Sequence, residues 1–334
     1  MILAPSWVGD AVLSHSLIQN IKNNTSNVVI DVASVPWVSA VYHKMPEVSE
    51  VIDVPLRHGI FNISELISCG KKLRTRHYDR AFILPRSLKS SLIPYFAKIP
   101  KRIGYLGEYR YGIINQIRNY DPLALDQTVK KFTNLERGST DDSIELLPPK
   151  LESNKQRATE ILKLNRLAPD TAFIVIAPGA EYGPAKQWPA NYFAKLIDYV
   201  SASNYEVILL GSPKDNEITQ DIMDQCQKKQ PLNFVGHLNL SDAIDLLSLS
   251  KALVTNDSGL MHVGAALDVP IVAIYGSTSP RMTPPIAKDH VIHWLNLSCG
   301  PCFKRACPLT HLRCLKEIYP EQVYSSLSEL ISIA

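Results

Sequence analysis

The sequence predicts an α/β protein with two domains, each built on a parallel sheet, and two observations support this. Short apolar runs rich in β-branched residues alternate with helical patterns in both halves of the 334-residue chain. Such alternation is typical of parallel sheets that are covered by helices. The length exceeds that of one ordinary core and suits two domains. We therefore expect two Rossmann-like domains that face a central cleft.

The expected elements follow in chain order. In the first half, strands are predicted at Ile2–Ala4, Val28–Ala33, Val51–Val54 and Ala81–Leu84, with helices at Asp10–Asn23 and Ile63–Arg76. In the second half, strands are predicted at Ala172–Ala177, Glu206–Gly211, Ala252–Asn256 and Ile271–Tyr275. The helices between them are predicted at Pro189–Ala202, Lys214–Lys228, Ser241–Leu249 and Gly259–Leu267.

The pattern breaks between Thr140 and Asn154, where acidic residues, Ser and Pro gather, as in Asp141-Asp142-Ser143 and Pro148-Pro149. This break divides the chain into domains at residues 1–150 and 151–334. Whether the last helix packs back on the first domain is left open.

Composition describes a soluble globular protein, with 46% hydrophobic and 20% charged residues. No apolar run approaches the ~18 residues that span a bilayer. The N-terminus lacks the basic region and long apolar stretch of a secretory signal. We therefore expect a cytoplasmic protein, in which disulfides are uncommon.

Positive charge is concentrated in the first half. Residues 54–118 hold 13 Lys and Arg against three acidic residues, although the whole chain carries a net charge of +3. This imbalance favours an anionic partner (a phosphorylated substrate, nucleic acid or an acidic membrane surface) over a merely solvated basic face. The stretch shows no helix-turn-helix, which argues against nucleic acid.

The most informative turn follows the strand predicted to end at Asn256. Asp257, Ser258 and Gly259 place a carboxylate, a hydroxyl and exposed backbone at the start of a helix. Unpaired N–H groups and the positive end of the helix dipole suit a phosphate there. His262 lies one turn further on and can point back at the same place. An ordinary Asp/Ser N-cap is the alternative.

A second turn of this kind follows the strand predicted at Ala172–Ala177. Gly179 and Ala180 permit close approach of a phosphate to the backbone, and Lys186 supplies a compact positive charge for an anionic leaving group. Because it lies in a loop, Lys186 is expected to be replaceable without loss of the fold. The spacing is not that of a Walker P-loop, and no G-x-G-x-x-G follows a strand.

Two more small, hydroxyl-rich loops follow strands of the second half. One contains Gly211, Ser212 and Asp215, and the Asp215 carboxylate either binds ribose hydroxyls or is an N-terminal helix charge. The other runs over residues 276–280. Since parallel strands end at one edge, we expect all four loops to meet there.

In the first half, the loop after the first strand ends at Asp10. Its carboxylate follows Gly9 at the loop tip, where it can take a proton from an incoming hydroxyl as a general base. A plain N-cap is again the alternative.

Three motifs together resemble glycosyltransferase family 9. They are Pro5-Ser6-Trp7-Val8-Gly9-Asp10, Pro178-Gly179-Ala180 with Lys186-Gln187-Trp188-Pro189, and Asn256-Asp257-Ser258-Gly259-Leu260-Met261-His262. The likeness covers essentially the whole chain in order, including Arg110-Tyr111-Gly112 and the late cysteine-rich segment. The family usually has two or three more residues before the first strand, so we expect that strand to be short.

The resemblance implies a two-domain GT-B architecture. It also implies inverting transfer of heptose from ADP-heptose to the first heptose of the lipopolysaccharide inner core on Kdo2-lipid A. Such an enzyme of Gram-negative bacteria is cytoplasmic and peripheral to the inner face of the cytoplasmic membrane. No cofactor is required, and stimulation by a divalent cation is left open.

The resemblance also assigns roles by position. Asp10 would be the base, and Lys186 would hold the diphosphate. The donor site would comprise Gly179, Ala180, Lys186, Gly211, Ser212, Asp215, Asp257, Ser258, Gly259 and His262. The acceptor site would comprise Ser6, Trp7, Arg57, Lys71, Arg74 and Arg110.

Four of the six cysteines cluster as Cys299-x2-Cys302-x4-Cys307-x6-Cys314. This spacing allows a structural zinc site, disulfide pairs or free thiols. Basic residues between the cysteines would lower thiol pKa values or contact phosphate.

Two other functions compete with the transferase that the resemblance implies. One is an enzyme of the same fold, either a family 9 enzyme with a different acceptor or an epimerase, and the other is a non-catalytic protein that binds a nucleotide sugar. Product analysis with ADP-heptose separates these alternatives.

Overall fold

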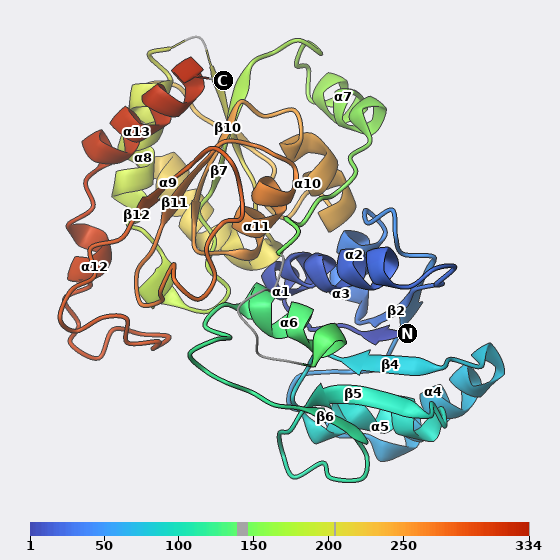
Figure 1. Cartoon of the computed structure of the whole chain (residues 1–334). Helices are drawn as coiled ribbons and strands as arrows, with labels where there is room; N and C mark the ends of the chain where they lie inside the picture. Colours follow the sequence, from blue (N-terminus) through green and yellow to red (C-terminus); the bar gives the residue numbers. More distant parts are fainter. Residues whose placement is uncertain (139–145, 204, 334) are drawn as a thin grey trace. The chain divides into compact units, whose positions relative to one another are not determined.

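The computed structural model describes residues 1–138, 146–203 and 205–333. The chain forms two compact units, Met1–Leu151 and Glu152–Ala334 (Figure 1). The division lies one residue from the boundary expected at 150/151. Part of the break expected at 140–154, including Asp141-Asp142-Ser143, lies outside the described residues.

The N-terminal unit is built on a six-stranded parallel sheet with the strand order β3-β2-β1-β4-β5-β6. Its strands are β1 (Ile2–Leu3), β2 (Asp31–Ser34), β3 (Glu50–Asp53), β4 (Arg80–Ile83), β5 (Lys101–Tyr105) and β6 (Gln116–Arg118). Its helices are α1 (Val8–Leu13), α2 (His15–Asn24), α3 (Pro36–Tyr42), α4 (Ile63–Leu73), α5 (Leu88–Phe96) and α6 (Thr128–Arg137), with a 3₁₀ turn η1 (Arg74–Arg76).

Several elements of this unit differ from the sequence prediction. The single helix expected at Asp10–Asn23 is two helices, α1 and α2, which meet at Ser14, whose hydroxyl donates to the carbonyl oxygen of Ala11 at 2.6 Å. The pattern also missed α3, α6 and β6. It missed α5, since Pro94 inside it reads as a helix breaker, and β5, since two basic residues open it.

The C-terminal unit repeats this plan with a parallel sheet in the order β12-β11-β10-β7-β8-β9. Its strands are β7 (Phe173–Ala177), β8 (Glu206–Leu209), β9 (Leu232–Asn233), β10 (Ala252–Asn256), β11 (Ile271–Ile274) and β12 (His290–His293). Its helices are α7 (Lys155–Leu164), α8 (Ala190–Val200), α9 (Asn216–Gln225), α10 (Leu240–Leu247), α11 (Gly259–Ala266), α12 (Arg313–Lys316) and α13 (Pro320–Ile333), with 3₁₀ turns η2 (Pro184–Lys186) and η3 (Pro213–Asp215). These two α/β units confirm the predicted fold class.

The last helix, α13, packs against its own unit. Val323, Leu327 and Leu330 join the buried cluster that the sheet and α8 form, beside the fully buried Trp188. The apolar face of α13 is thereby used within the C-terminal unit, whereas the sequence left open a return to the first domain. Among the described residues, no helix is long and apolar enough to cross a membrane.

Strand order locates the ligand-binding edge of each unit. In the C-terminal unit the chain leaves β7 toward β8 and later returns to β10 on the other side. In the N-terminal unit the corresponding strands are β1 and β4. Open parallel sheets bind ligands beyond the carboxyl ends of the strands at such a switch point.

Candidate functional site

Asn256, the last residue of β10, ties the loop after β7 to the switch point. Its side-chain Nδ2 donates to the carbonyl oxygen of Pro178 at 2.7 Å, and its Oδ1 accepts from the backbone N–H of Trp188 at 3.0 Å. One buried amide therefore holds both ends of the loop that carries Lys186. The sequence analysis did not assign Asn256 a role, although a polar residue that ends an apolar strand is the signal that marks it.

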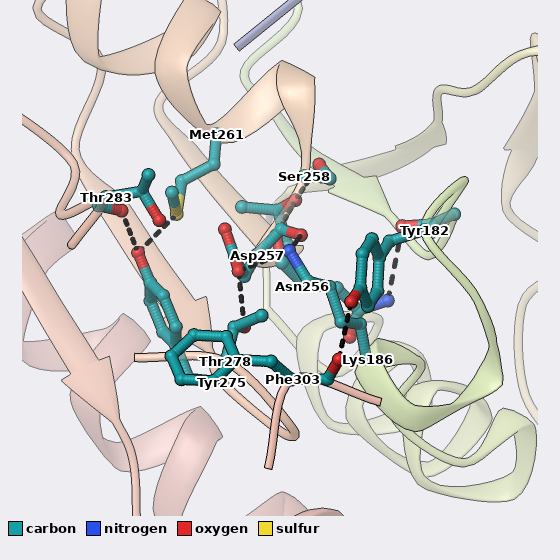
Figure 2. Close-up of polar contacts among 12 residues, drawn as sticks. Tyr182, Lys186, Asn256, Asp257, Ser258, Met261, Tyr275, Thr278, Thr283 and Phe303 are labelled. Atoms are coloured by element: carbon teal, nitrogen blue, oxygen red, sulfur yellow. Dashed lines mark hydrogen bonds and ion pairs between the residues drawn. The ribbon is translucent and has the colours of Figure 1, made fainter. Parts of the chain in front are cut away.

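Lys186 and Asp257 form the centre of the site (Figure 2). The Lys186 Nζ lies 2.6 Å from Asp257 Oδ2, which also accepts from the Thr278 hydroxyl at 2.5 Å. The Lys186 ammonium stands 5.0 Å from the centroid of the Tyr182 ring. The side chains of Lys186 and Asp257 are only 14% and 5% exposed, so the cation is held in one place at the edge of the sheet.

The N-terminus of α11 lies at the same place. Its N-cap residue, Ser258, pairs its hydroxyl with that of Thr255 at 3.0 Å and makes no side-chain capping bond to the helix. The first N–H groups of a helix have no partner within the helix, and the helix dipole favours negative charge there. Together with the Lys186 ammonium, they can bind a phosphate group.

His262 lies on α11 and is 5% exposed. Burial lowers its pKa to about 4, although the nearby Asp257 carboxylate opposes the shift, so the imidazole is neutral at pH 7. Among the described residues its Nδ1 finds no hydrogen-bond partner. A buried unpaired nitrogen is costly unless a ligand satisfies it.

The loop after β8 contacts this edge through Asp215. Asp215 Oδ2 accepts from the backbone N–H and the hydroxyl of Ser212, at 2.8 and 2.9 Å. A Cβ at Gly179 would lie 2.4 Å from this carboxyl group and one at Gly211 2.9 Å from it, so both positions need glycine. Asp215 is thus a capping residue that packs two glycines, which favours the helix-charge alternative over ribose binding.

The fourth loop, after β11, touches the Lys186 loop directly. The Ser277 N–H donates to the carbonyl oxygen of Ala185 at 3.0 Å, and a Cβ at Gly276 would lie 2.3 Å from that oxygen. Within the Lys186 loop, the carbonyl oxygen of Ala180 accepts from the N–H of Gly183 at 3.0 Å and closes a turn. All four loops therefore meet at one edge.

In the N-terminal unit, Asp10 is the third residue of α1 and Trp7 is the N-cap residue. Asp10 is therefore not a plain N-cap. Two indoles lie at the starts of helices on this edge. Trp7 is 45% exposed, and Trp37, in the first turn of α3, is 51% exposed and donates from Nε1 to the carbonyl oxygen of Ser6 at 2.9 Å. Trp37, which the sequence analysis missed, offers a flat apolar surface beside the Asp10 loop.

The basic residues of 54–118 separate into two groups. Arg57 follows β3 at the carboxyl edge of the sheet, where its carbonyl oxygen accepts from the Lys89 ammonium. Lys71 and Arg74 end α4, just before β4 begins, so they lie at the opposite edge, and Arg74 Nε donates to the carbonyl oxygen of Phe96 at 2.8 Å. The structure therefore does not bring Lys71 and Arg74 together with Arg57, because a helix that connects parallel strands ends at the amino edge, and an acceptor role for them stays a prediction.

Arg110, the remaining basic residue predicted for the acceptor site, is enclosed by the N-terminal unit. Its side chain is fully buried and donates to the carbonyl oxygens of Pro85, Ser87 and Tyr105 at 2.7–2.9 Å. Burial lowers its pKa to about 10. The guanidinium holds the loops that follow β4 and β5 and is not available to an acceptor.

The clustered cysteines Cys299, Cys302, Cys307 and Cys314 are all free thiols. Among the described residues, no group of three or more His, Cys, Asp or Glu side chains is arranged to hold a metal ion.

Two α/β units, each built on a six-stranded parallel sheet, are the architecture of the GT-B glycosyltransferases. A sequence profile of glycosyltransferase family 9 (heptosyltransferase) matches residues 66–313. The chain belongs to this family.

Individual relatives match most or nearly all of the chain. Lipopolysaccharide heptosyltransferase 2 of Salmonella typhimurium is 38% identical over 341 residues, 99% of this chain and 98% of the relative. The structure of E. coli ADP-heptose lps heptosyltransferase II matches with a TM-score of 0.89 at 35% identity, over 99% of this chain and 98% of that one. Lipopolysaccharide heptosyltransferase 3 of Escherichia coli K12 is 21% identical over 294 residues, 86% of this chain and 85% of the relative.

Proposed function

We propose that this glycosyltransferase moves heptose from ADP-heptose to the first heptose of the lipopolysaccharide inner core. The observation that carries the proposal is the Lys186–Asp257–Thr278 centre at the start of α11, in a chain 38% identical over its full length to a heptosyltransferase 2. The lower identity to a heptosyltransferase 3 favours the type 2 acceptor over other acceptors.

The C-terminal unit binds the donor in this proposal. The N–H groups that begin α11 and the Lys186 ammonium take the diphosphate, whose charge grows as the sugar bond breaks. Asp257 and Thr278 orient Lys186 rather than touch the phosphates. His262 is neutral, and its unpaired Nδ1 accepts a hydrogen bond from a hydroxyl group of the donor.

The N-terminal unit binds the acceptor, and Asp10 is the base. Inverting transfer needs the acceptor oxygen to attack the anomeric carbon as ADP leaves from the opposite face. A sugar hydroxyl is a poor nucleophile at neutral pH, so the Asp10 carboxylate takes its proton as the new bond forms. Trp7 and Trp37 offer surfaces for a sugar ring, and Arg57 offers positive charge for the phosphorylated acceptor.

Incubation with ADP-heptose and cores of defined structure tests the proposal, with the product read by mass spectrometry. We expect one added heptose on cores that carry a single heptose and none on Kdo2-lipid A that lacks heptose. Transfer to the heptose-free core would indicate a type 1 acceptor. Donor binding without transfer to any core would indicate a non-catalytic protein. Repeating the assay with a chelator and with Mg²⁺ measures whether a divalent cation contributes.

The proposed acceptor is anchored in a membrane, so we place the enzyme at the inner face of the cytoplasmic membrane as a peripheral protein. The basic residues of 54–118 supply attraction to anionic lipid. Sedimentation with vesicles of phosphatidylglycerol and phosphatidylethanolamine tests this location. Binding that weakens with salt supports it, and recovery of all protein in the supernatant at low salt contradicts it.

A further inference from the structure

The amino edge of the N-terminal sheet carries a concentration of positive charge that neither the donor site nor the proposed acceptor site uses. Helices α4 and α5 pack against each other (Figure 1), and both end at this edge, shortly before β4 and β5 begin. A Cβ at Gly70 of α4 would lie 2.6 Å from the Cβ of Phe96, so glycine is needed for this close approach. The ends of the two helices are therefore held next to each other.

A pocket of about 370 Å³ lies between these helix ends. Two aromatic and three cationic side chains line it: Tyr95, Phe96, Arg74, Lys98 and Arg102. Concave sites of about 300 Å³ or more are large enough for small organic ligands. In the described part of the chain, no Asp or Glu belongs to this lining. The pocket therefore favours a negatively charged ligand.

Main-chain carbonyl oxygens fix the two arginines. Arg74 Nε donates to the carbonyl oxygen of Phe96 at 2.8 Å. Arg102 donates to three carbonyl oxygens at 2.5–3.2 Å, and its Cζ lies 5.4 Å from the centroid of the Tyr95 ring. These carbonyl acceptors are uncharged, so they position the guanidinium groups and leave their positive charge in place.

Lys98 supplies the third positive charge. It follows α5 with a φ of 58°, and its N–H donates to the carbonyl oxygen of Tyr95 at 3.0 Å. Lys98 is exposed, and among the described residues its ammonium has no hydrogen-bonding partner. The ammonium can therefore turn to an incoming anion without breaking a hydrogen bond.

The three charges are not offset within the unit. Among the described residues, none of these cations forms an ion pair with Asp or Glu. The nearby Arg76, by contrast, donates to Glu50 at 2.7 Å. Burial lowers the pKa of Arg102, as expected for a charge that is partly removed from water without an anion beside it. Because like charges in one pocket repel each other, a bound anion would stabilise the unit.

We propose that the pocket lined by Arg74, Tyr95, Phe96, Lys98 and Arg102 binds a phosphomonoester. Such a group carries about two negative charges at pH 7, and guanidinium groups bind its oxygen atoms in pairs. The rings of Tyr95 and Phe96 supply an apolar wall for the organic part of the ligand.

This site is separate from the proposed chemistry. It lies at the edge of the sheet opposite the helix that carries Asp10, so its ligand does not compete with the proposed acceptor. A soluble sugar phosphate and the headgroup of a lipid such as phosphatidate share the phosphomonoester. Binding experiments with both kinds of probe distinguish the two sources.

Isothermal titration of the full-length protein with glucose 6-phosphate tests the soluble source, with glucose as the uncharged control. Lys98→Gln and Arg74→Gln should each weaken binding roughly tenfold, because each removes a hydrogen bond to a charged group. Arg74→Lys should restore part of the affinity. Lys251→Gln, which changes an exposed lysine just before β10, is the matched control and should bind as the wild type does.

Vesicles of phosphatidylcholine that contain phosphatidate test the lipid source, against vesicles that contain phosphatidylglycerol, a phosphodiester. A preference for phosphatidate that Lys98→Gln abolishes would assign the pocket to a lipid headgroup. If neither glucose 6-phosphate nor phosphatidate is preferred over its control, the proposal is overturned. Binding of glucose 6-phosphate that Lys186→Met abolishes and Lys98→Gln leaves unchanged would place the ligand at the donor edge and overturn the proposal as well.

Thermal unfolding separates a binding role of Lys98 from a structural one. Without phosphate, Lys98→Gln should melt no lower than the wild type, because it relieves the repulsion among the three cations. A saturating phosphomonoester should raise the melting temperature of the wild type by about 2 °C or more and leave that of the variant nearly unchanged. A variant that is less stable by the same amount with and without the ligand would contradict the proposal.

Discussion

Lys186 is held by a buried carboxylate, and this decides what its replacement does. Asp257 is 5% exposed and has the Lys186 ammonium and the Thr278 hydroxyl as partners. Removing one member of a buried ion pair leaves an uncompensated charge and costs about 3–5 kcal/mol. That the fold survives the loss of Lys186, because it lies in a loop, stays a prediction, and the buried pair adds the expectation that the fold is then less stable.

Lys186→Ala should lower kcat by at least about 10²-fold, because one positive group at the leaving diphosphate is lost. It should also lower the free energy of unfolding by roughly 3 kcal/mol, because Asp257 loses its partner. Steady-state kinetics and urea denaturation measure the two effects.

The double variant Lys186→Met/Asp257→Asn separates the effect on activity from the effect on stability. It removes both charges, so most of the stability should return while the activity stays low. Recovery of activity in the double variant would show that Lys186 does not act on the diphosphate.

His262 should make stability depend on pH. Its pKa is about 4 in the folded protein, below the ordinary value of 6.5. Above pH 6.5 the imidazole is neutral in both the folded and the unfolded protein. Between pH 6.5 and 4 only the unfolded protein takes up the proton, so the free energy of unfolding decreases by about 3 kcal/mol in total as the pH is lowered. From pH 7 to pH 5 the wild type should lose about 2 kcal/mol more than His262→Asn in urea denaturation. Equal losses in both proteins would contradict a buried neutral imidazole.

Replacing Asp10 distinguishes a catalytic base from a residue that only stabilises its helix. Asp10→Asn keeps the size of the side chain but cannot take a proton, so we expect kcat to fall at least about 10²-fold with little change in ADP affinity. As Asp10 is the third residue of α1, the loss of a charge that favours the helix N-terminus should cost less than about 1 kcal/mol. Near-normal turnover with a lower melting temperature would assign Asp10 a structural role only.

At the scale of the elements, the donor edge depends on four loops that hold one another. Asn256 fixes both ends of the Lys186 loop, Gly276 lets the β11 loop touch it, and Gly179 makes room for the Asp215 carboxyl group. Each contact is between loops far apart in sequence, and each needs the strands to end at one edge. A side chain at Gly179 would displace the Asp215 carboxyl group from its hydrogen bonds with Ser212, and with it the loop after β8.

The two edges of the N-terminal sheet should differ in function. Arg57→Glu, at the carboxyl edge, should raise the KM for the lipid acceptor several-fold and leave ADP affinity unchanged. Lys71→Glu is the matched control, since it reverses the same charge at the amino edge and should leave the KM near its wild-type value. Acceptor titrations at two salt concentrations measure both variants. An equal rise in both would mean that the whole basic stretch, rather than one edge, attracts the acceptor.

At the scale of the whole molecule, each unit has its own sheet, and the C-terminal unit alone contains the proposed donor groups. Hydrogen exchange with and without ADP should therefore show protection at residues 178–188 and 256–262. Exchange in the strands of the N-terminal unit should stay unchanged. Protection spread equally over both units would contradict a donor site confined to the second unit.

The sequence by itself determined the fold class, most of the central strands and the loops that carry the site. Buried strands such as β7, β10 and β11 were predictable within a residue or two, because apolar runs bounded by Gly, Asp or Ser report burial on both faces of a sheet. Elements interrupted by Pro or by basic residues, such as α5 and β5, were not predicted, because packing there overrides local preference.

Only the tertiary structure decided which of the predicted residues act together. It paired Lys186 with Asp257, turned Asp215 into a cap and buried Arg110 among carbonyl oxygens. It also placed Arg57 and Arg74 at opposite edges of a sheet, although both belong to one basic stretch of the sequence. The physical reason is that charge and motif are local properties of a chain, whereas the partner of a side chain and its exposure depend on how distant strands and helices pack.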